Sequence, residues 1–173
     1  IRRHLLFAAA ALAAGPAFAA RRKVVTILGD SITAGLGLSA AQALPARLEA
    51  ELIRLGVAAT VRGAGVSGDT SGGGLARVDF SIQADTDICV VELGANDLLQ
   101  GVDPRVTRGN LEKIVGRLQA RKIGVVLVGM RPPGAIGAGY AKDVAAIYPA
   151  IAKARAVPLY PDLLAGVGPA LRQ

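Results

Sequence analysis

Short apolar runs alternate with longer amphipathic stretches along the chain after residue 20. Five runs predict strands, over residues 24–28, 57–62, 87–93, 123–130 and 157–160, of which the second is the weakest. A run that is apolar throughout suits a strand buried on both faces, as in a parallel sheet. The stretches between the runs predict helices that begin at Pro45 and Pro104 and helices over 71–83 and 140–155. This alternation predicts an α/β fold.

The connections predict how the sheet and the helices are layered. Right-handed crossovers between parallel strands place helices on both faces, so we expect a three-layer α/β/α sandwich around a five-stranded parallel sheet. Asp103 followed by Pro104 marks the clearest helix start. The buried stripe of that helix comprises Leu111, Ile114, Val115 and Leu118. Pro149 is expected to kink or split the last helix.

Composition narrows the class of protein. The 173 residues suffice for one domain with a sizeable core. The net charge is +7, but the 20 Lys and Arg residues are scattered and aromatic residues make up only 3%, which disfavours a nucleic-acid partner. The single cysteine, Cys89, excludes an intramolecular disulfide, and its apolar surroundings in the sequence predict a buried side chain.

The first 19 residues have the pattern of a secretory signal peptide. Arg2 and Arg3 precede an apolar run over 5–14, which is too short to span a bilayer, and Ala17-Phe18-Ala19 forms an A-x-A cleavage site. We expect cleavage after Ala19, a periplasmic or secreted protein, and no stable membrane insertion afterwards. The alternative is an uncleaved anchor or a disordered tail.

Polar clusters follow the first three predicted strands, at residues 29–35, 67–71 and 94–97. Because the carboxyl ends of parallel strands meet at one edge of a sheet, we expect these clusters to converge. Ser31 offers a hydroxyl nucleophile, and its backbone N–H, the Gly68 N–H and the Asn96 side-chain amide offer three donors for an oxyanion. The combination predicts acyl transfer.

Three motifs, Gly29-Asp30-Ser31, Gly68 and Gly94-x-Asn96-Asp97, resemble the first three blocks of the SGNH (GDSL) hydrolases. The resemblance covers nearly all of residues 20–173 and is closest to the bacterial periplasmic arylesterases and the thioesterase/lysophospholipase enzymes. It implies a flavodoxin-like sheet, Ser31 as nucleophile, and Gly68 and Asn96 in the oxyanion hole. It also implies no metal or organic cofactor and fits a small ester, thioester or lysophospholipid as substrate. Separately, we expect a monomer.

The sequence departs from this family at the block that supplies the catalytic base. The family carries Asp-x-x-His near its C-terminus, whereas the one histidine here is His4, inside the leader. Asp162 lies upstream of where that block belongs, so the catalytic Asp is not assigned to it. We therefore expect a fragment of a longer gene, truncated at the C-terminus and without a final helix. Loss of the histidine alone lowers kcat about 2 × 10⁶-fold in subtilisin, so this polypeptide is predicted to be nearly inactive.

Three alternatives stay open. Gly63-x-Gly65-x-x-Gly68 has the form of a dinucleotide-binding fingerprint, but it follows the second predicted strand, and Asp69 brings a negative charge where a pyrophosphate would lie. Ser67 is a second candidate nucleophile, without the final glycine of a G-x-S-x-G elbow. A non-catalytic binding protein on the same fold is the third.

Overall fold

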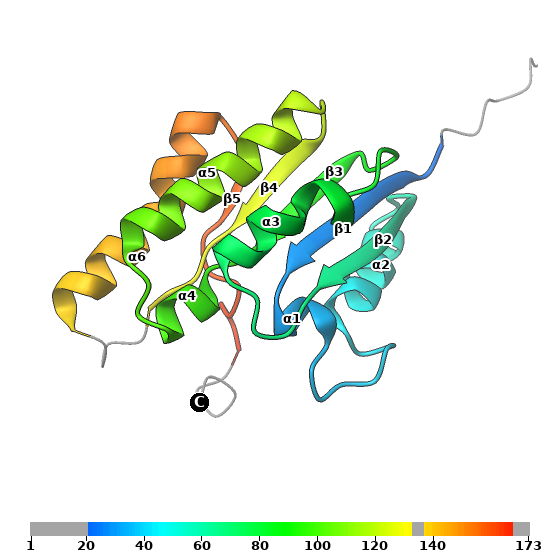
Figure 1. Ribbon diagram of the computed structural model, residues 1–173. Helices are drawn as coiled ribbons and strands as arrows, with labels where there is room; N and C mark the ends of the chain where they lie inside the picture. Colours follow the sequence, from blue (N-terminus) through cyan, green and yellow to red (C-terminus); the bar gives the residue numbers. More distant parts are fainter. Residues whose placement is uncertain (1–20, 133–136, 168–173) are drawn as a thin grey trace, which may run out of the picture.

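The computed structural model describes residues 21–132 and 137–167 (Figure 1). The predicted signal peptide, residues 1–19, lies outside these ranges and so does the predicted cleavage site after Ala19. The prediction that a C-terminal helix is missing likewise concerns residues outside them. Among the described residues, no helix is both long enough and apolar enough to cross a membrane.

Five parallel strands form one sheet in the order β2-β1-β3-β4-β5. The strands are β1 Lys23–Gly29, β2 Ala59–Gly65, β3 Ile88–Glu92, β4 Gly124–Val128 and β5 Leu159–Tyr160. This is the strand order of flavodoxin-like sheets, and it confirms the predicted five-stranded parallel sheet. The apolar pattern predicts the second strand over 57–62, which is too early: the strand begins at Ala59 and continues through Gly63 to Gly65, although glycines are uncommon within strands.

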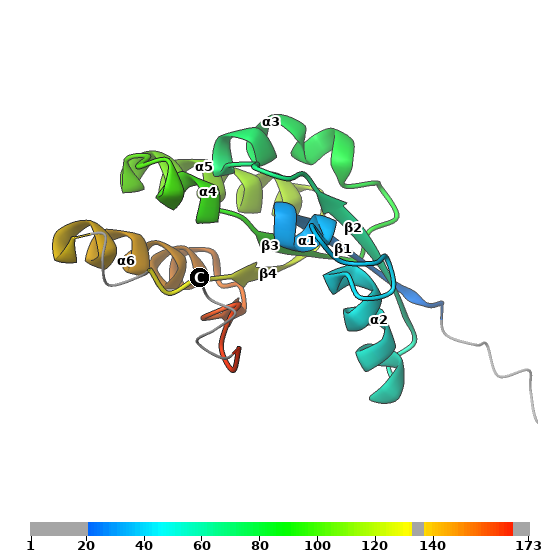
Figure 2. The same cartoon turned by 90° about the horizontal axis from the view of Figure 1, so that it is seen from below.

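Helices cover both faces of the sheet, which confirms the predicted three-layer α/β/α architecture. They are α1 Ser31–Ala34, α2 Leu44–Arg54, α3 Ser71–Ser81, α4 Ala95–Leu99, α5 Pro104–Ala120 and α6 Ala138–Arg155. Figure 2 shows α2 and α3 on opposite faces. The short helices α1 and α4 were not predicted, because four or five residues are too few to show a helical period.

The main core lies between the sheet and the helices α3, α5 and α6. Alternate residues of β3, Cys89 and Val91, point into this core and are fully buried. The predicted stripe of α5 is confirmed: Leu111, Ile114, Val115 and Leu118 are all inaccessible to solvent. α6 is one continuous helix across Pro149, which lies on its exposed side, so the proline does not split it.

The helix α3 forms although its first turn contains three consecutive glycines. The Thr70 hydroxyl accepts a hydrogen bond from the Gly73 N–H at 3.2 Å and caps the helix. The side chain of Leu93 occupies the position that a Cβ on Gly74 would need. The glycine therefore allows α3 to approach the end of β3 closely, next to the site loops.

Candidate active site

Three loops meet at the carboxyl edge of the sheet. β1 leads directly into Ser31, the first residue of α1, while the turn after β2 holds Gly68 and the first turn of α4 holds Asn96. β1 lies between β2 and β3, and the chain direction across the sheet reverses there. Such a topological switch point is where ligands bind in open α/β sheets. The structure thus brings the predicted clusters to one place.

Asn96 connects these loops through its side-chain amide. Its Nδ2 donates to the Asp30 carboxylate at 3.2 Å and to the Asp69 backbone carbonyl at 2.8 Å. Asp30 precedes Ser31 and Asp69 follows Gly68, so the amide is held between the two loops. Both of its hydrogens are engaged in this arrangement.

Asp30 also fixes the start of α1. Its Oδ1 accepts a hydrogen bond from the Ile32 N–H at 2.9 Å, and the helix ends at Gly35, whose φ of 75° lies in the left-handed region. Ser31 is held at the first helical position and is half-buried. Within the two described segments, neither its hydroxyl nor its backbone N–H has a hydrogen-bond partner.

Gly68 is required for its backbone conformation. Its φ is +82°, whereas a Cβ at this position would meet nothing within 4 Å. No partner for its N–H is found in the part of the chain that the structure describes. The loop therefore presents an unpaired donor at an exposed position.

Asp97 lies beneath the site and joins three helices. Its buried carboxylate accepts from the Ser71 N–H at 2.7 Å, the Ser71 hydroxyl at 2.5 Å and the Thr107 hydroxyl at 3.0 Å. This residue was identified only as part of a motif, and its contacts indicate a structural role. Gly94, in the same motif, has φ +116°, and the Tyr148 hydroxyl occupies the place of its missing Cβ.

Arg77, in α3, is a residue to which the sequence gives no role. Its guanidinium donates to the Asp69 carboxylate at 2.7 Å, the Ala64 carbonyl at 2.8 Å and the Gly29 carbonyl at 2.9 Å. The side chain thereby ties the ends of β1 and β2 to the loop that carries Gly68. Nothing in the sequence pattern of α3 distinguishes it from a surface arginine.

Glu92, at the end of β3, was also missed. Its Oε2 accepts from the Thr33 hydroxyl at 2.7 Å and lies 3.4 Å from the Asp30 N–H. Burial, and secondarily the charge of Asp30, raises the pKa of Glu92 to about 7. Burial also raises the pKa of Asp30, with a further contribution from Asp69. Neither Glu92 nor Asp30 forms an ion pair with a cation in residues 21–132 and 137–167.

A mostly apolar cavity of about 260 Å³ lies beside Ser31 and Asn96, because Ile32 and Ala95 line it. Its other walls come from β3, α4, the end of β4 and the turn after β5. They are Glu92, Leu93, Leu98, Leu99, Val128, Gly129, Met130, Arg131, Leu163 and Leu164.

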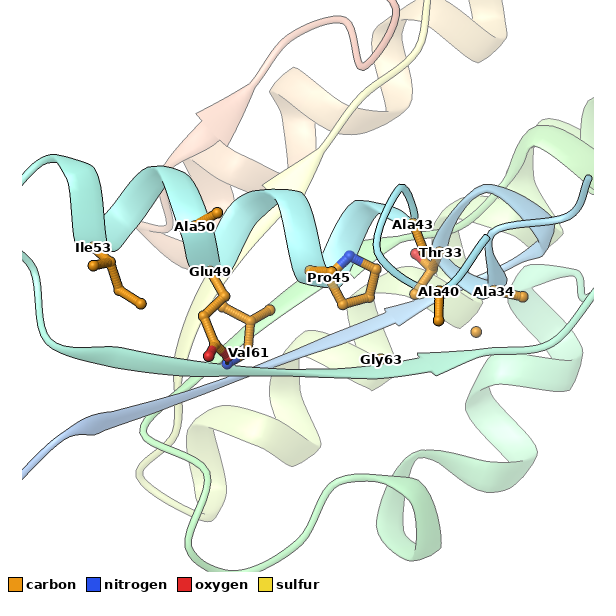
Figure 3. A pocket seen from close by; sticks show the side chains of 12 residues that line it. Thr33, Ala34, Ala40, Ala43, Pro45, Glu49, Ala50, Ile53, Val61 and Gly63 are labelled. Atoms are coloured by element: carbon orange, nitrogen blue, oxygen red, sulfur yellow. Dashed lines mark hydrogen bonds between the residues drawn. The ribbon is translucent and has the colours of Figure 1, made fainter. Parts of the chain in front are cut away.

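A second, open groove of about 700 Å³ runs between α2 and β2 (Figure 3). Gly63 and Gly65 lie within β2 itself, where Pro45 and the backbone of α1 take the places of their missing side chains. These glycines therefore admit close packing, unlike the glycines of a phosphate-binding loop, which precede a helix. This geometry does not support the dinucleotide hypothesis.

The structure also bears on two other kinds of site, a cysteine nucleophile and a metal site. Cys89 is fully buried, as predicted, and burial raises the pKa of its thiol to about 12, which disfavours the reactive thiolate. Among the described residues, no group of three or more His, Cys, Asp and Glu side chains could hold a metal ion.

The strand order and the three loops at its switch point define an α/β/α protein with a candidate site at the carboxyl edge of its sheet. Residues 27–171 match the GDSL-like Lipase/Acylhydrolase family, and the chain belongs to that family.

Relatives and solved structures agree with this assignment. The chain is 36% identical over 139 residues to an arylesterase of Vibrio mimicus, covering 80% of this chain and 70% of the relative. It is 35% identical over 150 residues to esterase TesA of Pseudomonas aeruginosa, covering 86% and 75%. Identity to thioesterase 1/protease 1/lysophospholipase L1 of Escherichia coli is 38% over 144 residues, covering 83% and 68%.

The structure of AlinE4, an SGNH-hydrolase family esterase, superposes with a TM-score of 0.83 at 41% identity, covering 88% of this chain and 84% of that chain. A crystal structure of TesA superposes with a TM-score of 0.79 at 35% identity, covering 85% and 82%. The family and these relatives identify a carboxylic-ester hydrolase.

Proposed function

We propose that the protein cleaves small esters, thioesters or lysophospholipids through an acyl-enzyme formed on Ser31. The observation that carries the proposal is the pair of unpaired N–H groups, of Ser31 and Gly68, at the same sheet edge as an unpaired serine hydroxyl. Preorganised donors of this kind stabilise the negative charge that develops on a carbonyl oxygen.

In the proposed reaction, the Ser31 oxygen bonds to the substrate carbonyl carbon and its proton passes to a base. The oxyanion accepts hydrogen bonds from the Ser31 N–H, the Gly68 N–H and the Asn96 amide. Collapse expels the alcohol or thiol, and water then releases the acid. Because both Asn96 amide hydrogens are engaged, the oxyanion must take one of them, and the 3.2 Å contact to Asp30 is the longer of the two.

The apolar cavity beside Ser31 supports a substrate with an apolar acyl or aryl group. Its walls are mostly aliphatic side chains such as Leu98, Leu99 and Met130. The names of the relatives, arylesterase, thioesterase and lysophospholipase, fall within this substrate class.

The general base is proposed to be a histidine, as in the family. The 173 residues contain only His4, which the structure does not describe. Asp162 lies near the sheet edge, but its Oδ1 accepts from the Leu164 N–H at 3.2 Å, which is a local turn contact. We therefore expect this polypeptide by itself to hydrolyse esters very slowly, and added imidazole to restore part of the rate by acting as the base.

The test compares hydrolysis of p-nitrophenyl butyrate by the 173-residue chain with and without imidazole, after subtraction of the imidazole-only rate. We expect an imidazole-dependent enzymatic rate that Ser31→Ala lowers by at least about 100-fold. The matched control is Ser67→Ala, which removes the alternative nucleophile and should keep the rate. An unchanged rate in Ser31→Ala, or a loss in Ser67→Ala alone, would overturn the assignment.

The second candidate function is a non-catalytic binding protein on the SGNH fold, because residues 21–132 and 137–167 contain no histidine that could act as the base. It predicts that an ester ligand binds, measured by calorimetry, while no imidazole-dependent rate exceeds that of Ser31→Ala. Turnover above that level excludes it.

We also propose that the protein is a periplasmic or secreted monomer with one domain over residues 20–173. The basic and apolar leader that precedes Ala20 supports export. N-terminal sequencing of the exported protein should begin at Ala20, and retention of Arg2 and Arg3 would contradict cleavage.

A further inference from the structure

The carboxyl group of Glu92 lies directly beneath the turn that carries Ser31. Only 4% of Glu92 is exposed, and only 2% of Thr33, whose hydroxyl donates to it at 2.7 Å. The Asp30 N–H is the second donor toward the same Oε2, at 3.4 Å. Glu92 therefore accepts hydrogen bonds from residues on both sides of Ser31.

The contact between Glu92 and Thr33 leaves no room for a side chain at Gly29. A Cβ on Gly29 would overlap both the Thr33 hydroxyl and the Glu92 carboxyl. The glycine at the end of β1 thus leaves just enough room for the pair to meet. A side chain at Gly29 would separate Glu92 from the turn, so the contact between Glu92 and the turn depends on this glycine.

Among the described residues, no cationic side chain forms an ion pair with Glu92. Asp30 faces it from the start of α1, with Asp69 behind it. From α3, Arg77 is directed to Asp69 and to the Gly29 carbonyl. From α6, the Tyr148 hydroxyl donates to the Leu93 carbonyl. Arg131 also lines the cavity, and its guanidinium approaches Asp162 at 3.9 Å.

We propose that Glu92 is a positioning residue that holds the Ser31 turn through Thr33 and Asp30, and that its protonation state alters how the turn is held. This inference rests on the proposed role of Ser31. When Glu92 is protonated, its carboxyl group is neutral and accepts a hydrogen bond from the Thr33 hydroxyl. An ionised Glu92 accepts it more strongly, since charge-assisted hydrogen bonds are stronger, but it then repels Asp30 at short range.

The repulsion reaches the proposed oxyanion donors through Asp30. The Asp30 carboxylate binds the Ile32 N–H and the Asn96 amide. A displacement of Asp30 therefore moves the start of α1 and the Asn96 side chain together. Burial, which raises the pKa of Glu92 to about 7, places this change near neutral pH.

The first experiment follows the turn without any need for activity. ¹H–¹⁵N spectra of the 173-residue chain are recorded between about pH 5.5 and 8.5. We expect the Asp30 and Ile32 backbone amides and the Asn96 side-chain amide to shift with one midpoint near 7, and Glu92→Gln to abolish that midpoint. The control Glu112→Gln removes a partly exposed carboxylate of α5, which pairs with Arg108, and should leave the midpoint unchanged. A midpoint that persists in Glu92→Gln assigns the titration to another group and overturns the inference.

The second experiment measures how well Ser31 is placed. An alkyl phosphonofluoridate is used in imidazole buffer. The Ser31 oxygen bonds to phosphorus, fluoride leaves and the hydroxyl proton passes to imidazole, so the adduct can be followed by mass spectrometry. Thr33→Val should slow labelling about tenfold by loosening the turn, and Thr33→Ser should restore it. Equal labelling in Thr33→Val and the wild type overturns the positioning role.

The two experiments separate failure of this inference from failure of the proposed function. If the wild type is not labelled at Ser31 at all, the nucleophile assignment fails. The pH-dependent spectra of the wild type and Glu92→Gln then still test whether Glu92 holds the turn. The same spectra also test the inference if Thr33→Val does not fold.

Discussion

At the scale of single residues, the glycines near Ser31 exclude side chains for two different reasons. Gly68 has open space around it and a positive φ, so only its backbone conformation requires glycine. Gly29 has no positive φ, but Thr33 and Glu92 fill the place of its Cβ. A substitution at Gly68 strains the backbone, whereas a substitution at Gly29 forces the packed side chains of Thr33 and Glu92 apart.

Gly29→Ala is expected to lower the free energy of unfolding by about 1–3 kcal/mol, because the new methyl group overpacks a buried contact. Denaturant unfolding measures this change. The matched control is Gly109→Ala in α5, where a Cβ would meet nothing within 4 Å. That substitution should raise stability by about 0.5–1 kcal/mol through helix propensity. Equal effects of the two substitutions would contradict the packing argument.

Glu92 should also make stability depend on pH. Its folded pKa of about 7 lies above its ordinary value of 4.5, so the unfolded chain loses this proton first as the pH rises. The stabilisation is complete below pH 4.5 and is lost as the pH passes through 7. Glu92→Gln removes this dependence. Relative to wild type, the variant should gain on the order of 3 kcal/mol between these limits, measured by denaturant unfolding at each pH. A constant difference would show that the carboxyl does not titrate in this range.

The sequence could single out Ser31, Gly68 and Asn96 as candidates because they follow three successive strands, and the structure brings their loops to one edge of the sheet. It could not identify Glu92 or Arg77. Glu92 follows an apolar strand like any residue at a strand end, and its role depends on contacts with a different segment. Long-range contacts of this kind leave no local pattern.

At the scale of secondary-structure elements, Asp97 joins α3, α4 and α5 beneath the site. Asp97 lies in α4, and its carboxylate accepts three hydrogen bonds from Ser71 and Thr107. These two residues lie at the starts of the longer helices α3 and α5. The loop that carries Gly68 leads straight into Ser71, so this anchor also determines where that loop ends.

Asp97→Ala is expected to destabilise the protein by about 3 kcal/mol or more, because it leaves buried donors without an acceptor. Asp97→Asn keeps one acceptor oxygen and should lose less. Thermal unfolding of both variants measures the order. If the two variants lost the same stability, the number of accepted hydrogen bonds would not explain the effect.

Elements longer than about ten residues could be predicted from their apolar period, as α5 shows with its stripe of four buried residues. Two features could not. α1 and α4 are too short to show a period, and their caps are formed by site residues. β2 extends into glycines that a local pattern assigns to a turn, and only packing against Pro45 and α1 explains them there.

At the scale of the whole molecule, β2 is an edge strand and needs protection against pairing with another chain. The Glu49 carboxylate, reaching from α2, accepts the Val61 N–H at 2.6 Å and occupies a donor of that strand (Figure 3). This contact supports the proposed monomer, because the edge offers one fewer free group for strand pairing.

Glu49→Ala should therefore increase self-association, measured as mass-average molar mass by light scattering over a concentration series. Glu51→Ala is the matched control, since it removes the same charge from the same helix, where Glu51 pairs with Arg54 at the surface. If both variants associate equally, the lost charge is the cause, and if neither associates, the edge is protected by other means.

The strand order β2-β1-β3-β4-β5 has a consequence for synthesis on the ribosome. After β1 and β2 pair, β3 adds to the free side of β1, and β4 and β5 each add to the newest edge. No strand has to insert between two that are already paired. The emerging chain can thus extend its sheet outward one strand at a time, in the order in which the residues leave the ribosome.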